Sequence, residues 1–338
     1  MTKKNTKTKT KKVVSKKVAS VKKLAKVSPS KTNRRLIVLV AILVLTFILS
    51  LVYLKTQASD QGIPAQLATS ISKQDESEKI NSAKEEFLEK SGYLLNNPFQ
   101  KVQETDFESL SFEKNVSILM YHYVEPETSA QSSMRRSLSV TPENLAKQAR
   151  WLYENDFKTL TLSQYFALVA EGDDIPAKSV IMTFDDGYID FFENAAPILN
   201  RYNMTATIFI IADSVGYPAY MDWDQIKILS EQGFEFGSHS MSHPNLRTLQ
   251  EEALAEELVE SKQKIEEKIG KSVNFLCYPM GFFDKRAEDA TRDAGYKGGI
   301  TTVNGYMVSN KNMYEIPRFR ITHTMSEEGF AWTVNITQ

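Results

Sequence analysis

Apolar and polar positions divide the chain from residue 115 onward into strand-like and helix-like segments. Short apolar runs bounded by turn residues predict buried strands at 116–123, 179–184, 205–212, 234–237 and 273–278. Longer amphipathic stretches predict helices at 142–155, 162–170, 193–202, 223–232, 249–269 and 284–294. Strands that alternate with helices predict an α/β fold with a parallel sheet, open or closed into a barrel. The number of units favours a (β/α) barrel of slightly reduced size.

A continuous apolar segment at 36–54 stands apart from this pattern. Its residues, LIVLVAILVLTFILSLVYL, carry no charge. A helix of this length spans about 28 Å, close to the hydrocarbon thickness of a membrane. A buried core helix is seldom apolar on every face for so long. The segment therefore predicts a single transmembrane helix.

Charge is distributed unequally around this segment. Residues 1–35 hold 14 of the 41 basic residues and no acidic one, whereas all 42 acidic residues follow Leu54. The positive-inside rule then predicts a cytoplasmic basic tail at 1–35 and an extracellular location for everything after Leu54. A cleaved signal peptide is the alternative, although its apolar core would normally be shorter. The single cysteine, Cys277, excludes an internal disulfide.

Two polar regions flank the predicted transmembrane helix. The basic tail has no aromatic residue and directly precedes the helix, so attraction to membrane lipid explains it better than nucleic-acid binding. Residues 55–114 are polar with little periodicity, which predicts an extracellular stalk or, alternatively, a small helical subdomain. The folded domain is expected at 115–338. The pattern specifies no oligomeric state.

Two motifs at predicted strand ends carry the candidate chemistry. TFDDG at 183–187 places two adjacent carboxylates after an apolar strand, where their repulsion is costly unless a cation or a shared proton compensates it. HSMSH at 239–243 places two of the four histidines on one face of a single helical turn. Pro244 disfavours helical geometry at His243, so this turn is expected to end there. The alternatives are a solvated Asp-Gly turn and an ordinary polar loop.

Together the motifs predict a metal-dependent hydrolase. Two imidazoles and one carboxylate form a three-ligand set that leaves a position for water, as in catalytic zinc sites. A second carboxylate beside the ligand could take a proton from that water, whose pKa the metal lowers toward neutrality. The ligand types favour Zn²⁺, with Co²⁺, Ni²⁺ or Fe²⁺ as alternatives.

The two motifs resemble the first and second signatures of the polysaccharide deacetylases of the NodB-homology type, carbohydrate esterase family 4. The resemblance covers roughly residues 115–322 and implies a distorted (β/α)7-type, NodB-like barrel. It also implies that Asp185 is the catalytic base and that Asp186, His239 and His243 are the metal ligands.

The third signature departs from the family pattern. The family usually has Arg-x-Pro-Tyr/Phe-Gly, whereas this chain has CYPMG at 277–281, so Cys277 stands where an arginine would orient the base. Arg318 is the candidate for that role and Arg320 is the fallback. An ordinary surface or salt-bridge role is the alternative for either arginine.

ILMYHYV at 118–124 resembles the N-terminal segment of the poly-N-acetylglucosamine deacetylase branch, in which the barrel is circularly permuted. This resemblance implies that His122 is the general acid that protonates the departing amine. His323 competes for that role, because the segment 321–323 superficially matches the family's usual C-terminal motif. We prefer His122, whose strand is more apolar. A structural role is the alternative for both histidines.

The expected function is therefore that of a membrane-anchored, metal-dependent deacetylase. Its expected partner is an acetylated polysaccharide, either poly-N-acetylglucosamine or peptidoglycan, from which it removes N-acetyl groups. The alternatives are an O-acetyl esterase of the xylan type and a catalytically silent carbohydrate-binding protein on the same fold. Five aromatic side chains could stack on sugar rings or instead pack in the core: Tyr121, Tyr123, Tyr188, Phe282 and Phe283.

Overall fold

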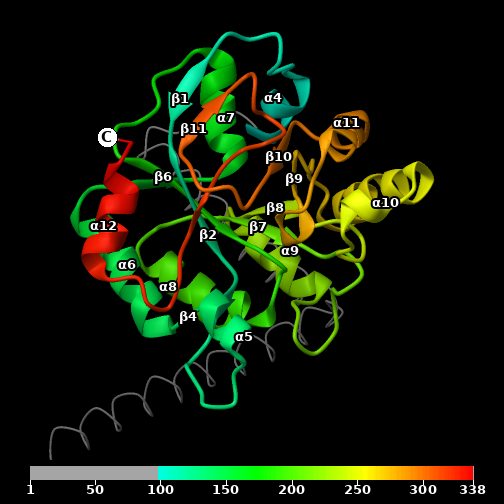
Figure 1. Cartoon of the computed structure of the whole chain (residues 1–338). Helices are drawn as coiled ribbons and strands as arrows, with labels where there is room; N and C mark the ends of the chain where they lie inside the picture. Colours follow the sequence, from blue (N-terminus) through cyan, green and yellow to red (C-terminus); the bar gives the residue numbers. More distant parts are fainter. Residues whose placement is uncertain (1–97, 338) are drawn as a thin grey trace, which may run out of the picture. The chain divides into compact units, whose positions relative to one another are not determined.

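A curved sheet of parallel strands forms the centre of the fold in the computed structural model, which describes residues 98–337 (Figure 1). Its strand order is β10-β9-β8-β7-β6-β2-β12, and β5 also pairs with β6. Along the chain these strands are β2 (Ser117–Tyr121), β5 (Lys158–Leu160), β6 (Ser179–Phe184), β7 (Thr207–Ile210), β8 (Glu235–Ser238), β9 (Phe275–Cys277), β10 (Gly298–Ile300) and β12 (Phe319–Arg320). All their pairings are parallel, as the sequence predicts.

Backbone hydrogen bonds join the two ends of this sheet. The N–H of Thr301, after β10, donates to the carbonyl of Ile316 at 2.9 Å. The N–H of Arg318, just before β12, donates to the carbonyl of Val303 at 2.8 Å. The sheet therefore curves into a distorted barrel, and the predicted parallel α/β architecture is confirmed.

Helices surround the sheet in Figure 1. The longer ones are α6 (Pro142–Glu154), α7 (Leu162–Glu171), α9 (Trp223–Glu231), α10 (Glu251–Ile269), α11 (Lys285–Asp293) and α12 (Glu327–Asn335), and the shorter ones are α4 (Pro98–Glu104), α5 (Ser133–Leu138) and α8 (Ala196–Arg201). At the start of α6 the Thr141 side chain accepts the N–H of Asn144, and Pro142 occupies the first turn. The sequence predicts this N-cap because the hydroxyl satisfies an otherwise unpaired donor.

Alternate residues of each strand belong to two different apolar cores. Ile118 of β2 packs inside the barrel, whereas its neighbour Leu119 packs between the sheet and the outer helices. This separation follows from the two-residue period of a strand. The interior core is continuous with α7, which supplies Tyr165 and Phe166.

Helix α7 closes the barrel at the amino ends of the strands. The N–H of Leu162 donates to the Thr207 hydroxyl at the start of β7. The N–H and hydroxyl of Ser163 donate to the buried Glu235 carboxyl at the start of β8, and burial raises the pKa of that carboxyl. The carboxyl ends of the strands, on the other side of the barrel, are the end where a site can form.

Residues 98–114 are part of the folded domain, so the stalk predicted at 55–114 does not include them. Helix α4 contacts α7, and the buried Phe107 ring lies 5.3 Å from the Phe166 ring, centroid to centroid. Strand β1 (Glu113–Asn115) pairs antiparallel with β11 (Met307–Ser309). The segment is too short and polar for its few buried positions to give a periodic signal.

The predicted transmembrane helix at 36–54, the basic tail at 1–35 and the rest of the predicted stalk lie outside the described residues. Within residues 98–337, every helix is too short or too polar to cross a bilayer.

Strand β10 is absent from the sequence-based expectations, as are β5, β12 and α12. In β10 the sequence Gly298-Gly299 suggests a loop, because glycine weakens an isolated strand. A Cβ at Gly299 would lie 2.3 Å from the Tyr278 hydroxyl. The two glycines are therefore required by close packing on neighbouring elements, which local sequence does not reveal.

We predict that Phe107→Ala lowers the free energy of unfolding by about 3 kcal/mol, because it empties a filled position in the interior core. Equilibrium urea unfolding measures this change. The matched control is Tyr153→Ala, since Tyr153 is 60% exposed. Equal, small effects of both substitutions would show that 98–114 is not part of the core.

Candidate active site

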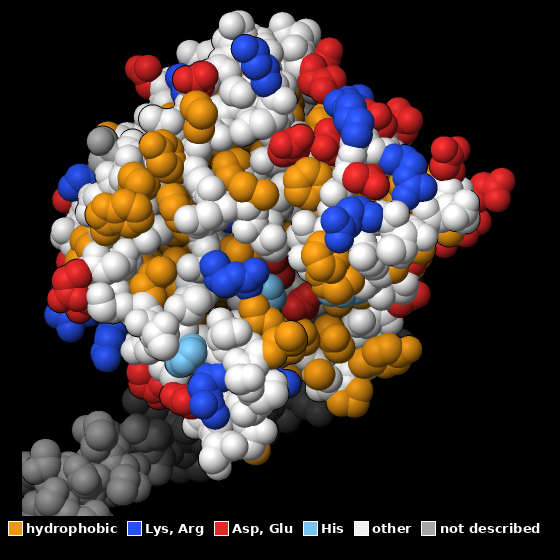
Figure 2. All heavy atoms as spheres, viewed as in Figure 1, with side chains coloured by type: hydrophobic (Ala, Val, Ile, Leu, Met, Phe, Trp, Pro, Cys, Tyr) orange, Lys and Arg blue, Asp and Glu red, His pale blue; other side chains and the backbone are white. Residues whose placement is uncertain are grey.

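The predicted site residues gather where neighbouring strands end. His122 follows β2, Asp185 and Asp186 follow β6, and His239 follows β8. Because these strands are parallel members of one sheet, their carboxyl ends meet at the same end of the barrel. Figure 2 shows histidine and acidic side chains together in a hollow near the middle of one face, with hydrophobic side chains beside it.

Asp185 is held by an arginine whose five N–H donors are all used. The fully buried Arg318 donates two hydrogen bonds to the Asp185 carboxylate, at 2.7 and 2.8 Å. Its other donors bind the Thr183 hydroxyl at 2.8 Å, the Thr301 carbonyl at 2.8 Å and the Cys277 sulfur at 3.2 Å. The carboxylate is therefore fixed in position and orientation.

The charge of Arg318 keeps Asp185 ionised. Burial alone would raise the pKa of this carboxyl, but the adjacent charges of Arg318 and His122 lower it well below its usual range. Arg318 is thus the predicted arginine that contacts Asp185, and its role as the replacement for the arginine of the third signature stays a prediction. The fallback, Arg320, makes no hydrogen bond to Asp185 within the described chain.

Asp186, His239 and His243 present one ligand atom each to a common point. Asp186 Oδ1 lies 3.4 Å from His239 Nε2 and 3.6 Å from His243 Nε2. Ligand atoms about 2.0–2.1 Å from a tetrahedral ion lie about 3.3–3.4 Å from one another. The three residues thus fit a divalent cation, with room for a further ligand.

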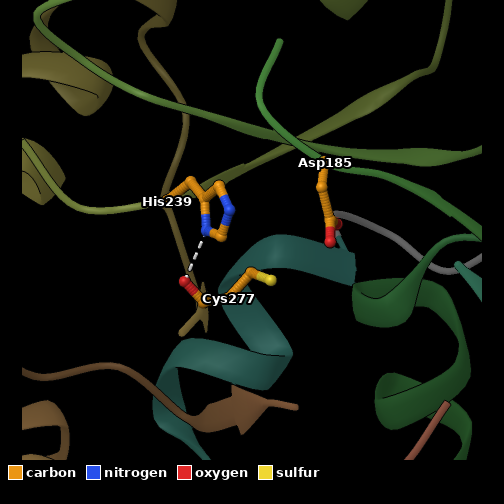
Figure 3. A group of neighbouring side chains, drawn as sticks. All are labelled: Asp185, His239 and Cys277. Carbon is orange, nitrogen blue, oxygen red and sulfur yellow. Dashed lines mark hydrogen bonds between the residues drawn. The ribbon is translucent and has the colours of Figure 1, made fainter. Parts of the chain in front are cut away.

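His239 presents the nitrogen that a metal requires. Its Nδ1–H donates to the carbonyl of Cys277 at 2.7 Å (Figure 3). Its Nε2 lies 3.4 Å from Asp186 Oδ1 and would be the atom that binds a cation. Burial would lower the pKa of His239, but Cys277 and Asp186 raise it. At His243, burial and the charge of His239 lower the pKa to about 4, so that imidazole is neutral near pH 7.

A second cluster, Asp185, His239 and Cys277, also has ligand atoms close together (Figure 3). Arg318 contacts both the Asp185 carboxylate and the Cys277 sulfur of this cluster. A guanidinium within hydrogen-bond distance repels a cation. The cluster around Asp186 is therefore the better metal site.

The backbone at Asp186 is turned to face the histidines. Asp186 has φ 73° and Gly187 has φ 76°, both in the left-handed region. A Cβ at position 187 would lie 2.8 Å from Ile210 Cγ2, so only glycine fits after the paired carboxylates. Strain of this kind at a non-glycine residue is typical of functional sites.

The HSMSH segment is a loop, and the predicted helical turn is wrong. Ser240 has φ 64° and His243 has φ 62°, both incompatible with a right-handed helix. The N–H of His243 instead donates to the Ser240 hydroxyl at 3.0 Å. The histidines converge because the loop folds back on itself, and Pro244 prevents the helix from forming.

Glu257 of α10 holds this loop, and the sequence does not single it out. Its carboxylate accepts the N–H groups of Met241 and Ser242, each at 2.9 Å, and the Ser242 hydroxyl at 2.5 Å. Glu257 is one of many acidic residues on α10, so no local pattern separates it from the solvated ones.

The two candidate general acids, His122 and His323, have different surroundings. The largely buried His122 has its Nε2 3.8 Å from Asp185 Oδ2. Burial lowers its pKa, and the charges of Asp185 and Asp186 partly oppose this effect. His323 forms no ion pair with either aspartate within the described residues, and its Nδ1 is buried without a hydrogen-bond partner there.

The predicted sugar-stacking aromatics divide into core and surface residues. Tyr121 is fully buried against Phe184, so of the two predicted alternatives it takes the one in the core. Tyr123 and Tyr188 are partly exposed and stack on each other with centroids 4.0 Å apart. Phe282 is 39% exposed, and Phe283, also partly exposed, stacks on Tyr278.

We predict that Glu257→Gln weakens Zn²⁺ binding by about 10- to 100-fold, because residues that orient metal ligands have effects of this size. Competition with a chromophoric chelator measures the affinity. The control is Glu256→Gln, which changes an exposed acidic residue on the same helix. Indistinguishable affinities for the two variants would show that Glu257 does not position the histidines.

Comparisons with known proteins find relatives of this chain among polysaccharide deacetylases. A family model for polysaccharide deacetylases matches residues 172–299. The chain is 30% identical over 213 residues to YxkH of Bacillus subtilis, a protein assigned to the polysaccharide deacetylases, and the match covers 63% of this chain and 74% of YxkH. It is 30% identical over 201 residues to the poly-β-1,6-N-acetyl-D-glucosamine N-deacetylase of Staphylococcus aureus strain MRSA252, covering 55% and 69% of the two chains.

Solved structures share the fold. The deacetylase PplD of Streptococcus pyogenes, solved with acetate, superposes with a TM-score of 0.61 at 25% identity, over 67% of this chain and all of PplD. The structure of BA0330 from Bacillus anthracis gives a TM-score of 0.60 at 27% identity, over 67% and 71% of the two chains. IcaB from Ammonifex degensii, at 20% identity and a TM-score of 0.55, supports the fold alone. Fold, motifs and sequence identity thus lead to one conclusion: this chain belongs to the polysaccharide deacetylase family of hydrolases.

Proposed function

We propose that the protein is a membrane-anchored deacetylase that uses a divalent cation, Zn²⁺ by preference, to remove N-acetyl groups from N-acetylglucosamine residues. The convergence of Asp186, His239 and His243 next to the clamped Asp185 carries this proposal. The substrate is a cell-envelope or extracellular polysaccharide. The staphylococcal relative supports poly-N-acetylglucosamine, and peptidoglycan is the other candidate.

Each residue of the site has a chemical task in this proposal. Asp186, His239 and His243 would hold the cation, which would supply Lewis acidity and lower the pKa of a water molecule. Asp185 accepts the proton of the water that attacks the acetyl carbonyl, and Arg318 keeps the Asp185 carboxylate ionised and oriented. The backbone N–H of Met280 is the proposed donor to the developing oxyanion.

His122 then protonates the departing nitrogen, which yields acetate and a free amine. Its pKa is lowered by burial in the resting site. Negative charge that develops on the oxyanion would favour the protonated imidazole and so raise that pKa when the proton is needed.

The proposed location follows from the sequence. The apolar segment at 36–54 and the basic tail at 1–35 support a single-pass anchor with a cytoplasmic N-terminus and contact with anionic lipid. The catalytic domain would then lie outside the cell, where envelope polysaccharides are accessible.

We predict that metal removal abolishes acetate release from N-acetylglucosamine oligomers and that added Zn²⁺ restores it. The measurement is enzymatic detection of acetate after treatment with a chelator and dialysis. Asp185→Asn is the control, since it leaves the three proposed ligands intact. This variant should bind Zn²⁺ with turnover reduced about 10²- to 10⁴-fold.

Undiminished acetate release by the metal-stripped protein would refute this mechanism. Parallel assays with O-acetylated xylan distinguish an esterase from an amidase. A protein that binds the oligomers but releases no acetate from either substrate class would be the silent carbohydrate-binding alternative.

We also predict that His122→Ala lowers kcat about 10²- to 10⁴-fold, as expected for loss of a general acid. His323→Ala should change kcat by less than about threefold, because its effect would be structural. Steady-state acetate release with a thermal-melting check on both variants measures this difference. The opposite ranking would assign the acid to His323.

A further inference from the structure

Arg320 points into the barrel one layer nearer its mouth than Arg318. Phe319 and Ile321 belong to the core between the sheet and the outer helices. Since side chains alternate along a strand, Arg318 and Arg320 both face the barrel interior. Arg318 reaches Asp185 there, and Arg320, two residues further toward the carboxyl end of β12, lies closer to the open end.

The guanidinium of Arg320 is unpaired within residues 98–337. It forms no hydrogen bond or ion pair with any residue in 98–337, and its Nη1 is enclosed without an acceptor. Asp185 is close enough to interact with it electrostatically, but both oxygens of that carboxylate already bind Arg318. An enclosed N–H donor without an acceptor is destabilising.

The surroundings place this unpaired cation at the active site. Its charge acts on His122 as well as on Asp185. A group on the substrate could therefore satisfy Arg320 while the acetamide lies at Asp185.

Charge and shape define that group. The planar fork of a guanidinium matches two oxygens of a carboxylate or a phosphodiester. Each carries a single negative charge, and the nearby Asp185 and Asp186 carboxylates disfavour a dianion. An unmodified N-acetylglucosamine polymer has no such group.

We propose that Arg320 is a specificity-determining residue that binds a monoanionic oxygen group, a carboxylate or a phosphodiester, on the glycan beside the N-acetyl group that is removed. This inference rests on the proposed deacetylase function. The preferred substrate would then be a glycan that carries a carboxylate or a phosphodiester close to the N-acetylated sugar.

The test compares charged and uncharged versions of the same glycan. One pair is an oligomer of alternating N-acetylglucosamine and its 3-O-lactyl ether, with the lactyl carboxylates free or converted to methyl esters. The other pair is an N-acetylglucosamine oligomer joined by phosphodiesters and the same oligomer with methylated phosphates. The readout is the ratio of kcat/KM for acetate release, charged over uncharged, which does not depend on the fraction of folded enzyme.

The wild type should prefer the charged member of at least one pair by about 10- to 100-fold, the range for a hydrogen bond between charged groups. Arg320→Gln should abolish that preference, and Arg320→Lys should retain part of it. The control is Arg201→Gln, an exposed arginine at the end of α8 that should leave the ratio unchanged. The pair that shows the preference identifies carboxylate or phosphodiester.

A wild type without preference in either pair, or an Arg320→Gln variant with an unchanged ratio, would overturn the inference. A third outcome is that acetate inhibits Arg320→Gln more weakly than it inhibits the wild type while the ratio of kcat/KM stays unchanged. That result would assign Arg320 to product binding and would also overturn the inference. If the wild type releases no acetate from any of the four glycans or from unmodified N-acetylglucosamine oligomers, the proposed function fails. Calorimetric binding of the same pairs to wild type and Arg320→Gln then tests the anion site separately.

Discussion

The buried ion pair between Arg318 and Asp185 is the interaction on which the site depends. It joins the segment leading into β12, the last strand along the chain, to the end of β6 in the middle of the sheet. Removal of either partner would leave an uncompensated buried charge, which typically costs about 3–5 kcal/mol. The pair therefore couples the alignment of the strands to the ionisation and aim of the candidate base.

Cys277 connects this pair to the candidate metal ligands. Its sulfur accepts a hydrogen bond from Arg318, and its carbonyl accepts one from His239 Nδ1–H. An arginine at position 277, as the family usually has, would compete with Arg318 for the same buried space. The smaller cysteine leaves room for Arg318, which reaches both Asp185 and the Cys277 sulfur from another segment of the chain.

Backbone strain and a distant carboxylate hold the ligands in place. Asp186, Ser240 and His243 all adopt positive φ angles, which are unfavourable for these residues outside a constraining structure. Glu257 supplies that constraint for the histidine loop by accepting three hydrogen bonds from two consecutive residues. Rigid strands and α10 thereby position side chains that the loops alone would not hold.

The sequence by itself determined the alternation of strands and helices, the paired carboxylates after β6 and the two histidines after β8, because these features depend on local patterns of polarity. Only the tertiary structure decided that Arg318 and not Arg320 contacts Asp185, that His122 and not His323 lies beside it, and that the histidines sit on a loop. It also revealed β10, whose Gly298 and Gly299 are required by close packing, and the inclusion of residues 98–114 in the core. These outcomes depend on contacts between segments far apart in the chain, and such contacts leave no periodic trace in the residues that make them.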